Sequence, residues 1–347
     1  MKVLLTGGAG FIGQHVLHEL LSRDHEVRVL DSLRADVHSG RQWAAPAGID
    51  FQVGDIRDAA AVDRAVSGIE AVIHLAAKVG LGVNVSDLPD YASSNDVGAA
   101  ELLAGMARAG VSRLTLASSM VVYGEGIGQC SEHGAVMPAP RSEGAMKSGN
   151  FEPPCPLCGE ALATALVTED APLDPRNAYA TSKLAQEFYA SNWARVTGGC
   201  VAALRYHNVY GPGMPRDTPY AGVAAIFTSA LRRGEAPHVF EDGGQRRDFV
   251  HVRDVAAATV LACEKHVAGV RAFNVGSGTP RTVGDMAEAL ATALNGPNPI
   301  LTGYFRLGDV RHITADSTRL RTELGWQPRV SFADGMSELA RSAPAAL

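Results

Sequence analysis

The chain has 347 residues, of which 46% are hydrophobic and 20% charged, and its formal net charge at pH 7 is −6. This length can bury a large core, and the composition excludes a disordered chain. The acidic balance argues against nucleic acid or an anionic membrane surface as a partner. No apolar run is long enough to cross a bilayer and no signal-peptide pattern opens the sequence, so we expect a cytoplasmic protein.

Short apolar segments alternate with amphipathic ones over the first two hundred residues. Predicted strands lie at 2–7, 26–31, 49–55, 71–77, 113–119 and 201–209, and predicted helices at 11–23 and 96–110. Such alternation is typical of a parallel sheet with helices on both faces. The sequence therefore predicts a Rossmann-type doubly wound α/β domain over 1–210 and a smaller substrate-binding lobe over 211–347. That lobe should contain a helix near 252–265, with the chain crossing between the two parts.

The first predicted strand leads into "GGAGFIG" and then a helix. Gly7, Gly10 and Gly13 permit a tight turn and a close approach of a dinucleotide, and the helix N-terminus offers free N–H groups to its pyrophosphate. Asp31 closes the second strand, where a carboxylate accepts hydrogen bonds from a ribose diol and repels a 2′-phosphate. We therefore expect NAD rather than NADP, although Arg34 lies nearby and a solvated loop acid is the alternative role for Asp31.

Two further features point to catalysis. "NAYATSK" places Tyr179 and Lys183 four residues apart, so that on a helix both lie on one face. A lysine ammonium and a positive nicotinamide would stabilise the phenolate and make the tyrosine a usable base. "ASSMVVYG" places Ser119 at the carboxyl end of the fifth strand, where ligands bind in open parallel sheets. A chance pair on a surface helix and a strand-end cap are the respective alternatives.

Six stretches carry a resemblance to a known family. They are "TGGAGFIG", "HLAAKVG", "SSMVVYG", "YATSK", "LRYHNVYGPG" and "RRDFVHVRDVAAA". Together they resemble the extended short-chain dehydrogenase/reductase family, which includes the nucleotide-sugar epimerases and dehydratases. The resemblance covers nearly the whole chain and implies a homodimer.

The resemblance implies roles for individual residues. Tyr179 would be the base, Lys183 would bind the nicotinamide ribose and tune that base, and Ser119 would hydrogen-bond the reacting oxygen. The residues expected to contact NAD are Gly7, Gly10, Phe11, Ile12, Gly13, Asp31, Ser32, Asp55, Ile56, Leu75, Ala76, Ala77, Lys78, Asn95, Tyr179, Lys183 and Tyr206.

The same resemblance extends to the substrate. Asn208 would contact the sugar nucleotide, and Arg247 and Arg306 would hold its diphosphate, a role that suits a planar bidentate donor. For either arginine a surface ion pair is the alternative. Neither the base, UDP or dTDP, nor the sugar, a hexose or a deoxyhexose, follows from these residues.

The residues that follow Ser119 bear on the reaction. Dehydratases of this family have an Asp–Glu pair where this chain has Met120 and Val121, which cannot transfer protons. Dehydration is therefore disfavoured, and return of the hydride to the other face of a 4-keto intermediate, a 4-epimerisation, is expected. Two alternatives stay open. One is an NAD(P)H-dependent reductase of 4-keto sugars, and the other is a non-catalytic NAD-binding regulator.

Residues 125–175 break the α/β rhythm with a long insertion rich in Gly and Pro. "CSEH" supplies Cys130 and His133, and "CPLC" supplies Cys155 and Cys158. Two such pairs suit tetrahedral Zn²⁺ in a closed, structural site. A free thiol pair beside an exposed histidine is the alternative.

The place of the insertion in the chain also carries an expectation. It leaves after the strand with Ser119 and returns at the helix with Tyr179, so we expect it to lie over the sugar end of the cleft. The Cys/His loop resembles inserts in bacterial deoxysugar enzymes similar to dTDP-L-rhamnose 4-epimerases.

Overall fold

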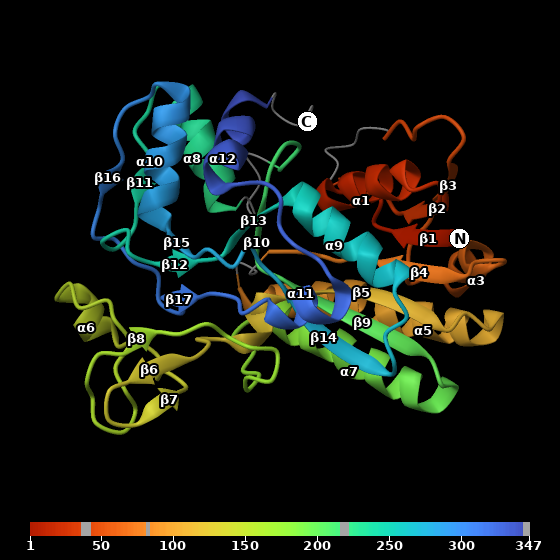
Figure 1. Ribbon diagram of the computed structural model, residues 1–347, viewed down its shortest axis with the longest axis horizontal. Coiled ribbons are helices and arrows are strands. Elements are labelled where there is room, and N and C mark those ends of the chain that lie inside the picture. Colours follow the sequence, from red (N-terminus) through yellow and green to blue (C-terminus); the bar gives the residue numbers. More distant parts are fainter. Residues whose placement is uncertain (36–42, 81–83, 216–221, 343–347) are drawn as a thin grey trace.

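In the computed structural model, which describes residues 1–35, 43–80, 84–215 and 222–342, seven parallel strands form the main sheet (Figure 1). The strand order is β14-β9-β5-β4-β1-β2-β3. The strands are β1 (Lys2–Thr6), β2 (Glu26–Asp31), β3 (Asp50–Val53), β4 (Ala71–His74), β5 (Arg113–Ser119), β9 (Cys200–Tyr206) and β14 (Val270–Val275). The central strands are almost entirely buried, which accounts for their continuous apolar sequences. The predicted doubly wound parallel sheet is confirmed.

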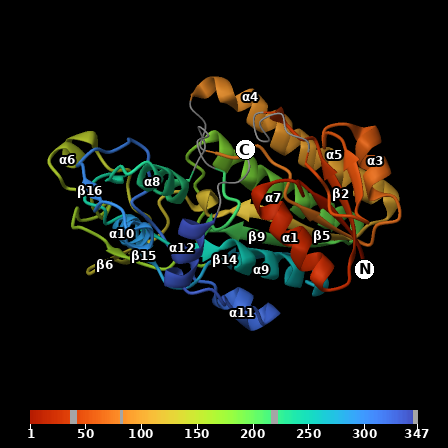
Figure 2. The same ribbon diagram turned by 90° about the horizontal axis from the view of Figure 1, so that it is seen from above.

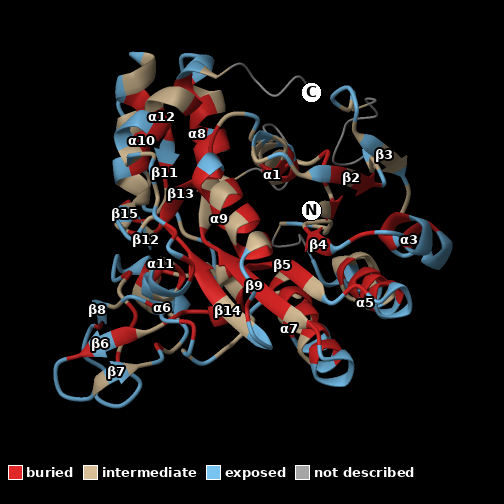
Figure 3. Ribbon diagram, turned by 45° about the vertical axis from the view of Figure 1, so that its right-hand side comes forward, coloured by how far each residue is buried: buried red, intermediate tan, exposed pale blue. Residues whose placement is uncertain are grey.

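Helices cover both faces of this sheet (Figure 2). On one face α1 (Phe11–Ser22) packs beside α9 (Val252–Glu264), and α11 (Thr318–Leu324) lies against β14. The other face carries α3 (Ala59–Val66), α5 (Gly98–Ala109) and α7 (Ala178–Thr197). Their apolar sides bury two large clusters against the strands, and the buried residues follow the strands and the inward sides of the helices (Figure 3).

Two predicted strands end three residues earlier than expected. The strand predicted at 71–77 ends at His74, because the backbone then turns beside the glycine-rich loop and the Ala76 N–H binds the Thr6 hydroxyl at 3.2 Å. The strand predicted at 201–209 ends at Tyr206, and the short strand β10 (Asn208–Tyr210) pairs instead with β13 (Phe249–His251). Both breaks lie at the carboxyl edge of the sheet.

The helix predicted at 96–110 also begins differently. A 3₁₀ turn η1 (Val85–Asp87), the short α4 (Leu88–Tyr91) and a π-helical turn η2 (Ala92–Val97) precede α5 without interruption. Helix α5 then ends at Ala109, because the next residue, Gly110, has a φ of 70° in the left-handed region.

In its described residues, the smaller lobe contains three helices and several short strands. Its helices are α8 (Val223–Arg232), α10 (Val283–Leu294) and α12 (Phe332–Arg341). Its remaining strands pair as β11 (His238–Val239) with β16 (Ile300–Leu301), and as β15 (Arg281–Thr282), β12 (Arg246–Arg247) and β17 (His312–Ile313) in that order. The chain returns from this lobe to the sheet domain in α9, β14 and α11, so residues after 211 belong to both parts.

The insertion has more structure than its composition indicates. After the 3₁₀ turn η3 (Met120–Tyr123), an antiparallel sheet forms in the order β7-β6-β8, and a short helix follows β7. These elements are β6 (Gly128–Cys130), β7 (Gly134–Val136), α6 (Glu143–Lys147) and β8 (Ala163–Thr164). The unit lies beneath the smaller lobe (Figure 1). Among the described residues no helix is both long and apolar enough to span a membrane.

Candidate active site

A cleft of about 480 Å³ opens at the carboxyl edge of the main sheet, between it and the smaller lobe. Sixteen of the seventeen residues predicted to contact NAD line this cleft, and Asn95 is the exception. The proposed substrate residues Ser119 and Asn208 line it as well. The topology explains this gathering, because loops that follow parallel strands meet at one edge of the sheet.

The glycine-rich turn lies at the base of the cleft. Gly7 has a φ of 72°, and a β-carbon there would lie 2.7 Å from the backbone nitrogen of Ala76. A β-carbon at Gly13 would lie 2.1 Å from the Gly7 carbonyl oxygen. Helix α1 begins next to this turn without a side-chain cap or an acidic residue in its first turn. Its N-terminal N–H groups suit an anion such as a pyrophosphate.

Asp31 lies at the end of β2 and is 8% exposed. Its carboxylate accepts hydrogen bonds from the backbone N–H groups of Ala9 at 3.0 Å and Leu33 at 2.9 Å. It therefore connects the glycine-rich turn to the loop that follows β2, and it faces the cleft.

An ionic cluster near Asp31 was not predicted from the sequence. Arg34 donates two hydrogen bonds to Asp90, at 3.1 and 3.0 Å, and Lys78 also binds Asp90. The hydrogen bond from Arg34 is the main reason that the pKa of Asp90 lies well below its usual range, with Lys78 and Ser94 contributing. No spacing rule connects Asp90 to the other two residues, since the turns between β4 and α5 bring it to the cleft.

Asn95 does not line the cleft but contacts the backbone of Lys78, which does. Its side-chain oxygen accepts from the Lys78 N–H at 2.7 Å, and its amide donates to the Lys78 carbonyl at 3.0 Å and the Ser182 hydroxyl at 2.8 Å. The side chain is fully buried. Asn95 thus fixes the backbone of Lys78 and links it to helix α7.

Tyr179 and Lys183 project from the first two turns of α7. Asn177 caps this helix by accepting from the Ala180 N–H at 2.8 Å. The Lys183 ammonium is 3% exposed, donates to the Ala117 carbonyl at 2.8 Å and lies 5.9 Å from the centre of the Tyr179 ring. Burial lowers the pKa of Lys183 to about 8, against the opposing effect of Glu187. The lysine therefore still carries its charge at neutral pH.

The Tyr179 phenol lies against Ser119. Burial raises the pKa of Tyr179 to about 12, while a hydrogen bond with Ser119 acts in the opposite direction. Ser119 ends β5 and lies within 3.4 Å of the Val121 N–H, a distance too long for a strong cap. The hydroxyl, the phenol and the ammonium thus come together at one point of the cleft, from β5 and α7.

The remaining cleft wall is largely apolar. Met120 and Val121 face the cleft directly after Ser119, and they offer no proton-transfer group. His207, which the sequence reasoning did not single out, lies beside Asn208 and is 4% exposed. Burial lowers the pKa of His207 to about 4, so the imidazole is neutral at pH 7.

Arg247 and Arg306 do not line the cleft. The Arg247 guanidinium donates to the backbone carbonyls of Val310 at 2.6 Å and Arg311 at 2.9 Å, and burial lowers its pKa to about 10. Arg306 is exposed, and its guanidinium lies 5.3 Å from the centre of the Phe240 ring. Both belong to the smaller lobe, close to the segment that carries β17.

The four Cys and His residues of the insertion come together. All four ligand atoms lie within 4.8 Å of one another. The Cys130 sulfur lies 3.5 Å from His133 Nδ1 and 3.6 Å from the Cys158 sulfur, and Cys155 lies 3.8 Å from His133 Nδ1. The ligand atoms of a tetrahedral zinc site lie about 3.5–3.8 Å apart. The cluster therefore has the donors and spacing of a closed metal site.

The insertion itself lies elsewhere than expected. We predicted it over the sugar end of the cleft, yet none of residues 125–175 lines the cleft. Ion pairs from Arg141 to Glu241 and from Glu152 to Arg311 hold it against the smaller lobe instead.

Comparison with known proteins agrees with this arrangement. The family model described as the NAD dependent epimerase/dehydratase family matches residues 3–143 and 158–276, leaving 144–157, inside the insertion, unmatched. The chain is 33% identical to a dTDP-L-rhamnose 4-epimerase of Burkholderia thailandensis over 97% of this chain and 93% of that protein.

Solved structures extend the likeness to the fold. A UDP-glucose 4-epimerase of Thermotoga maritima with UDP-glucose has a TM-score of 0.79 at 30% identity, over 98% of this chain and 97% of the other. A Thermus thermophilus UDP-glucose 4-epimerase in complex with NAD has a TM-score of 0.75 at 31% identity, over 98% of both chains. The chain therefore belongs to the NAD-dependent epimerase/dehydratase family.

Proposed function

We propose that this protein is an NAD-dependent 4-epimerase of a UDP- or dTDP-linked hexose or deoxyhexose. The observation that carries the proposal is the junction of Ser119, Tyr179 and Lys183 beside a glycine-rich turn, next to Met120 and Val121. The junction suits removal of a hydroxyl proton, and the apolar pair lacks the groups that elimination of water needs. The two 4-epimerases at 30% and 33% identity support this choice.

The residues of the cleft have distinct tasks in this reaction. The glycine-rich turn and Asp31 would hold NAD, and this cofactor would supply reversible hydride transfer at carbon 4. Tyr179 takes the proton of the 4-hydroxyl, and Ser119 hydrogen-bonds the same oxygen. The ammonium of Lys183 stabilises the phenolate, since a nearby positive charge favours the ionised form. After the 4-keto sugar turns in the cleft, the hydride would return to the other face of carbon 4, and Tyr179 gives the proton back to the 4-oxygen.

We further propose that Cys130, His133, Cys155 and Cys158 bind one structural Zn²⁺. The fit of their spacing to a tetrahedral site supports this. Four protein ligands leave no position for substrate, and the cluster lies outside the cleft. The metal would stabilise a unit whose own buried apolar cluster is small.

Isotope labelling tests the epimerase. Purified protein is incubated with UDP- and dTDP-sugars that carry deuterium on carbon 4, without added nicotinamide. We expect interconversion of two 4-epimers, with the deuterium retained on carbon 4 because it leaves and returns through the same bound cofactor. Strict dependence on added NAD(P)H and a 4-keto sugar would instead assign a ketoreductase.

A further inference from the structure

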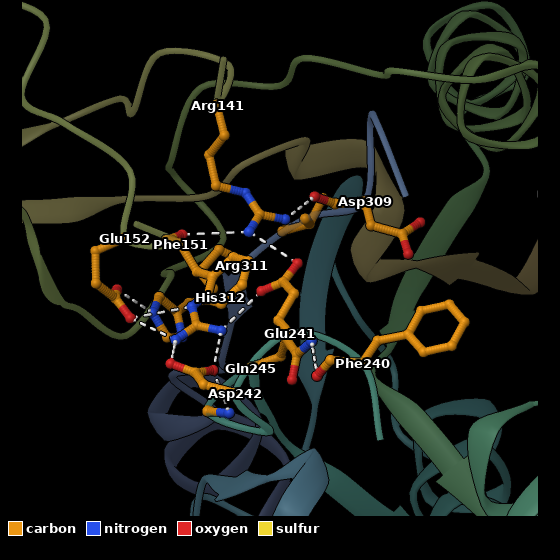
Figure 4. Close-up of polar contacts among 12 residues, drawn as sticks. Arg141, Phe151, Glu152, Phe240, Glu241, Asp242, Gln245, Asp309, Arg311 and His312 are labelled. Carbon is orange, nitrogen blue, oxygen red and sulfur yellow. Dashed lines mark hydrogen bonds and ion pairs between the residues drawn. The ribbon is translucent and has the colours of Figure 1, made fainter. Parts of the chain in front are cut away.

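A buried ionic cluster joins the insertion to the smaller lobe (Figure 4). Arg311, at the start of the segment that carries β17, is 2% exposed. Its guanidinium binds Glu152 of the insertion at 2.6 Å, and Glu241 and Asp242 of the lobe at 2.7 Å each. One cation thus bridges carboxylates from both units.

A second arginine connects the same two units, but this arginine belongs to the insertion and its partners belong to the smaller lobe. Arg141 belongs to the insertion, and its guanidinium binds the Glu241 carboxylate at 2.8 Å and the Asp309 carbonyl at 2.7 Å. The side chains of Arg141 and Glu241 are 3% and 2% exposed. Glu241 therefore lies between two guanidinium groups, one from each unit. Its φ of 53° is in the left-handed region, which a non-glycine residue keeps only where its surroundings enforce it.

His312 extends the contact to strand β12. Its Nδ1 accepts a hydrogen bond from the Arg246 N–H at 3.1 Å, so in the neutral ring the proton lies on Nε2. Nε2 then donates to Glu152 at 2.7 Å. Glu152 thereby holds two successive residues, Arg311 and His312, of one segment.

The bridged segments contact Arg247 and Arg306, the two arginines that the family resemblance assigns to the diphosphate. The carbonyls of Val310 and Arg311 accept from the Arg247 guanidinium, so the position of that side chain follows the backbone at 310–311. Phe240, which directly precedes Glu241, lies under Arg306. Movement of the bridged segments would displace both arginines.

We propose that the insertion acts as a positioning unit for substrate binding. Arg141 forms an ion pair with Glu241, and Glu152 forms one with Arg311. This interlock fixes the carbonyls that Arg247 contacts and the Phe240 ring that Arg306 contacts. The insertion thus controls affinity for the nucleoside diphosphate part of the substrate without touching the cleft. The inference rests on the proposed function and on the family resemblance, which implies the diphosphate role of Arg247 and Arg306, because neither arginine lines the cleft in this structure.

Calorimetry on the NAD-loaded enzyme with UDP and dTDP as probes tests the interlock. We expect Glu152→Gln to weaken binding of the preferred diphosphate about tenfold, since the amide loses the charge-assisted contact with Arg311 and only part of that loss reaches the arginines. Arg141→Lys, which keeps the charge but not the guanidinium fork, should act in the same direction. In turnover both variants should raise KM with kcat nearly unchanged, and NAD affinity should not move.

Glu143→Gln is the matched control, because Glu143 lies in the same insertion and, among the residues that the structure describes, pairs only with exposed Lys147 at 2.8 Å. This variant should bind the diphosphates like the wild type. Unchanged diphosphate affinity in Glu152→Gln and Arg141→Lys would overturn the interlock alone. Equal weakening of NAD and diphosphate would show a general loss of structure and overturn it as well. A wild type that binds neither diphosphate would refute the proposed function, and the interlock with it.

Discussion

Burial shifts the pKa values of Tyr179 and Lys183 in opposite directions. Burial raises the pKa of the phenol to about 12 and lowers that of the ammonium to about 8, because each loses solvation in its charged form. The phenol alone is therefore a poor base at pH 7. Its use as a base depends on positive charge placed beside it, which Lys183 supplies from 5.9 Å.

Replacement of Tyr179 by Phe should keep the ring and remove the proton acceptor. We expect kcat to fall by about 10²–10⁴, the usual contribution of acid–base catalysis, while NAD affinity is kept. Steady-state rates and calorimetry measure the two quantities. Tyr189→Phe, on the exposed side of the same helix, is the control and should be fully active. Near-normal turnover by Tyr179→Phe would mean that another group is the base.

Asp31 should determine the choice between NAD and NADP. Its carboxylate already binds the N–H groups of Ala9 and Leu33, so it is held where a 2′-phosphate would meet a fixed negative charge. We expect the wild type to bind NAD more tightly, and Asp31→Ala to narrow the difference. Binding of both cofactors to wild type, Asp31→Ala and the surface variant Asp63→Ala measures this. Equal or tighter NADP binding by the wild type would contradict the assignment.

At the scale of elements, we expect the insertion to depend on its Cys/His cluster. Its other buried apolar residues are few, and its β-strands are two or three residues long. Such short strands do not form a stable unit by themselves. A metal at the cluster would join the β6–β7 hairpin, which carries Cys130 and His133, to the turn with Cys155 and Cys158.

Zinc content and proteolysis test this dependence. Protein prepared without chelators should hold about one zinc per chain, and Cys155→Ser should lose it and become sensitive to protease within 125–175 before the rest unfolds. Cys200→Ser, a thiol outside the insertion, should keep both metal and resistance. Metal-free wild-type protein would rule out the site.

How far the sequence predicts this structure depends on whether the signal is local. Strands β1, β2 and β5 and helices α1 and α9 were predicted within about a residue, because apolar runs, glycines and periodicity lie within each element. The roles of the glycine-rich turn, Ser119, Tyr179 and Lys183 were predicted in the same way. Strand β14 was missed. It is six residues long and lies in the sequence between segments of the smaller lobe, so its residues do not indicate that it pairs with β9 of the main sheet.

The rest of the site depends on contacts between distant residues. Asp90 reaches Arg34 and Lys78 only because η1, α4 and η2 turn beside β4. The position of the insertion likewise depends on Glu152 and Arg311, which are far apart in sequence. Neither pair has a spacing rule, so the sequence alone placed the insertion over the wrong part of the molecule.

For the whole molecule, the interlock predicts a pH dependence of stability. Burial acts to raise the pKa of Glu152, but the hydrogen bonds from His312 and Arg311 outweigh it and lower the pKa from 4.5 to about 2. A carboxyl with a lowered folded-state pKa stabilises the protein above its unfolded pKa, and this contribution is lost as pH falls through the folded value. The window therefore runs from about pH 4.5 down to about 2.

Urea unfolding of the wild type and Glu152→Gln across this window measures the effect. The wild type should be more stable at pH 6, and the difference should shrink as pH falls toward 2, because Gln does not titrate. Glu143→Gln should follow the wild-type curve at every pH. A constant difference between wild type and Glu152→Gln would show that the carboxylate is not the stabilising form.

The return of the chain in β14 has a consequence for synthesis on the ribosome. Strand β14 follows β9 by about 60 residues, and nearly all of them build the smaller lobe and α9. At about 5–20 residues per second, several seconds pass between translation of the two strands. During that time β9 has an unpaired edge, which can pair with other chains. The main sheet is therefore completed only after much of the smaller lobe has been translated.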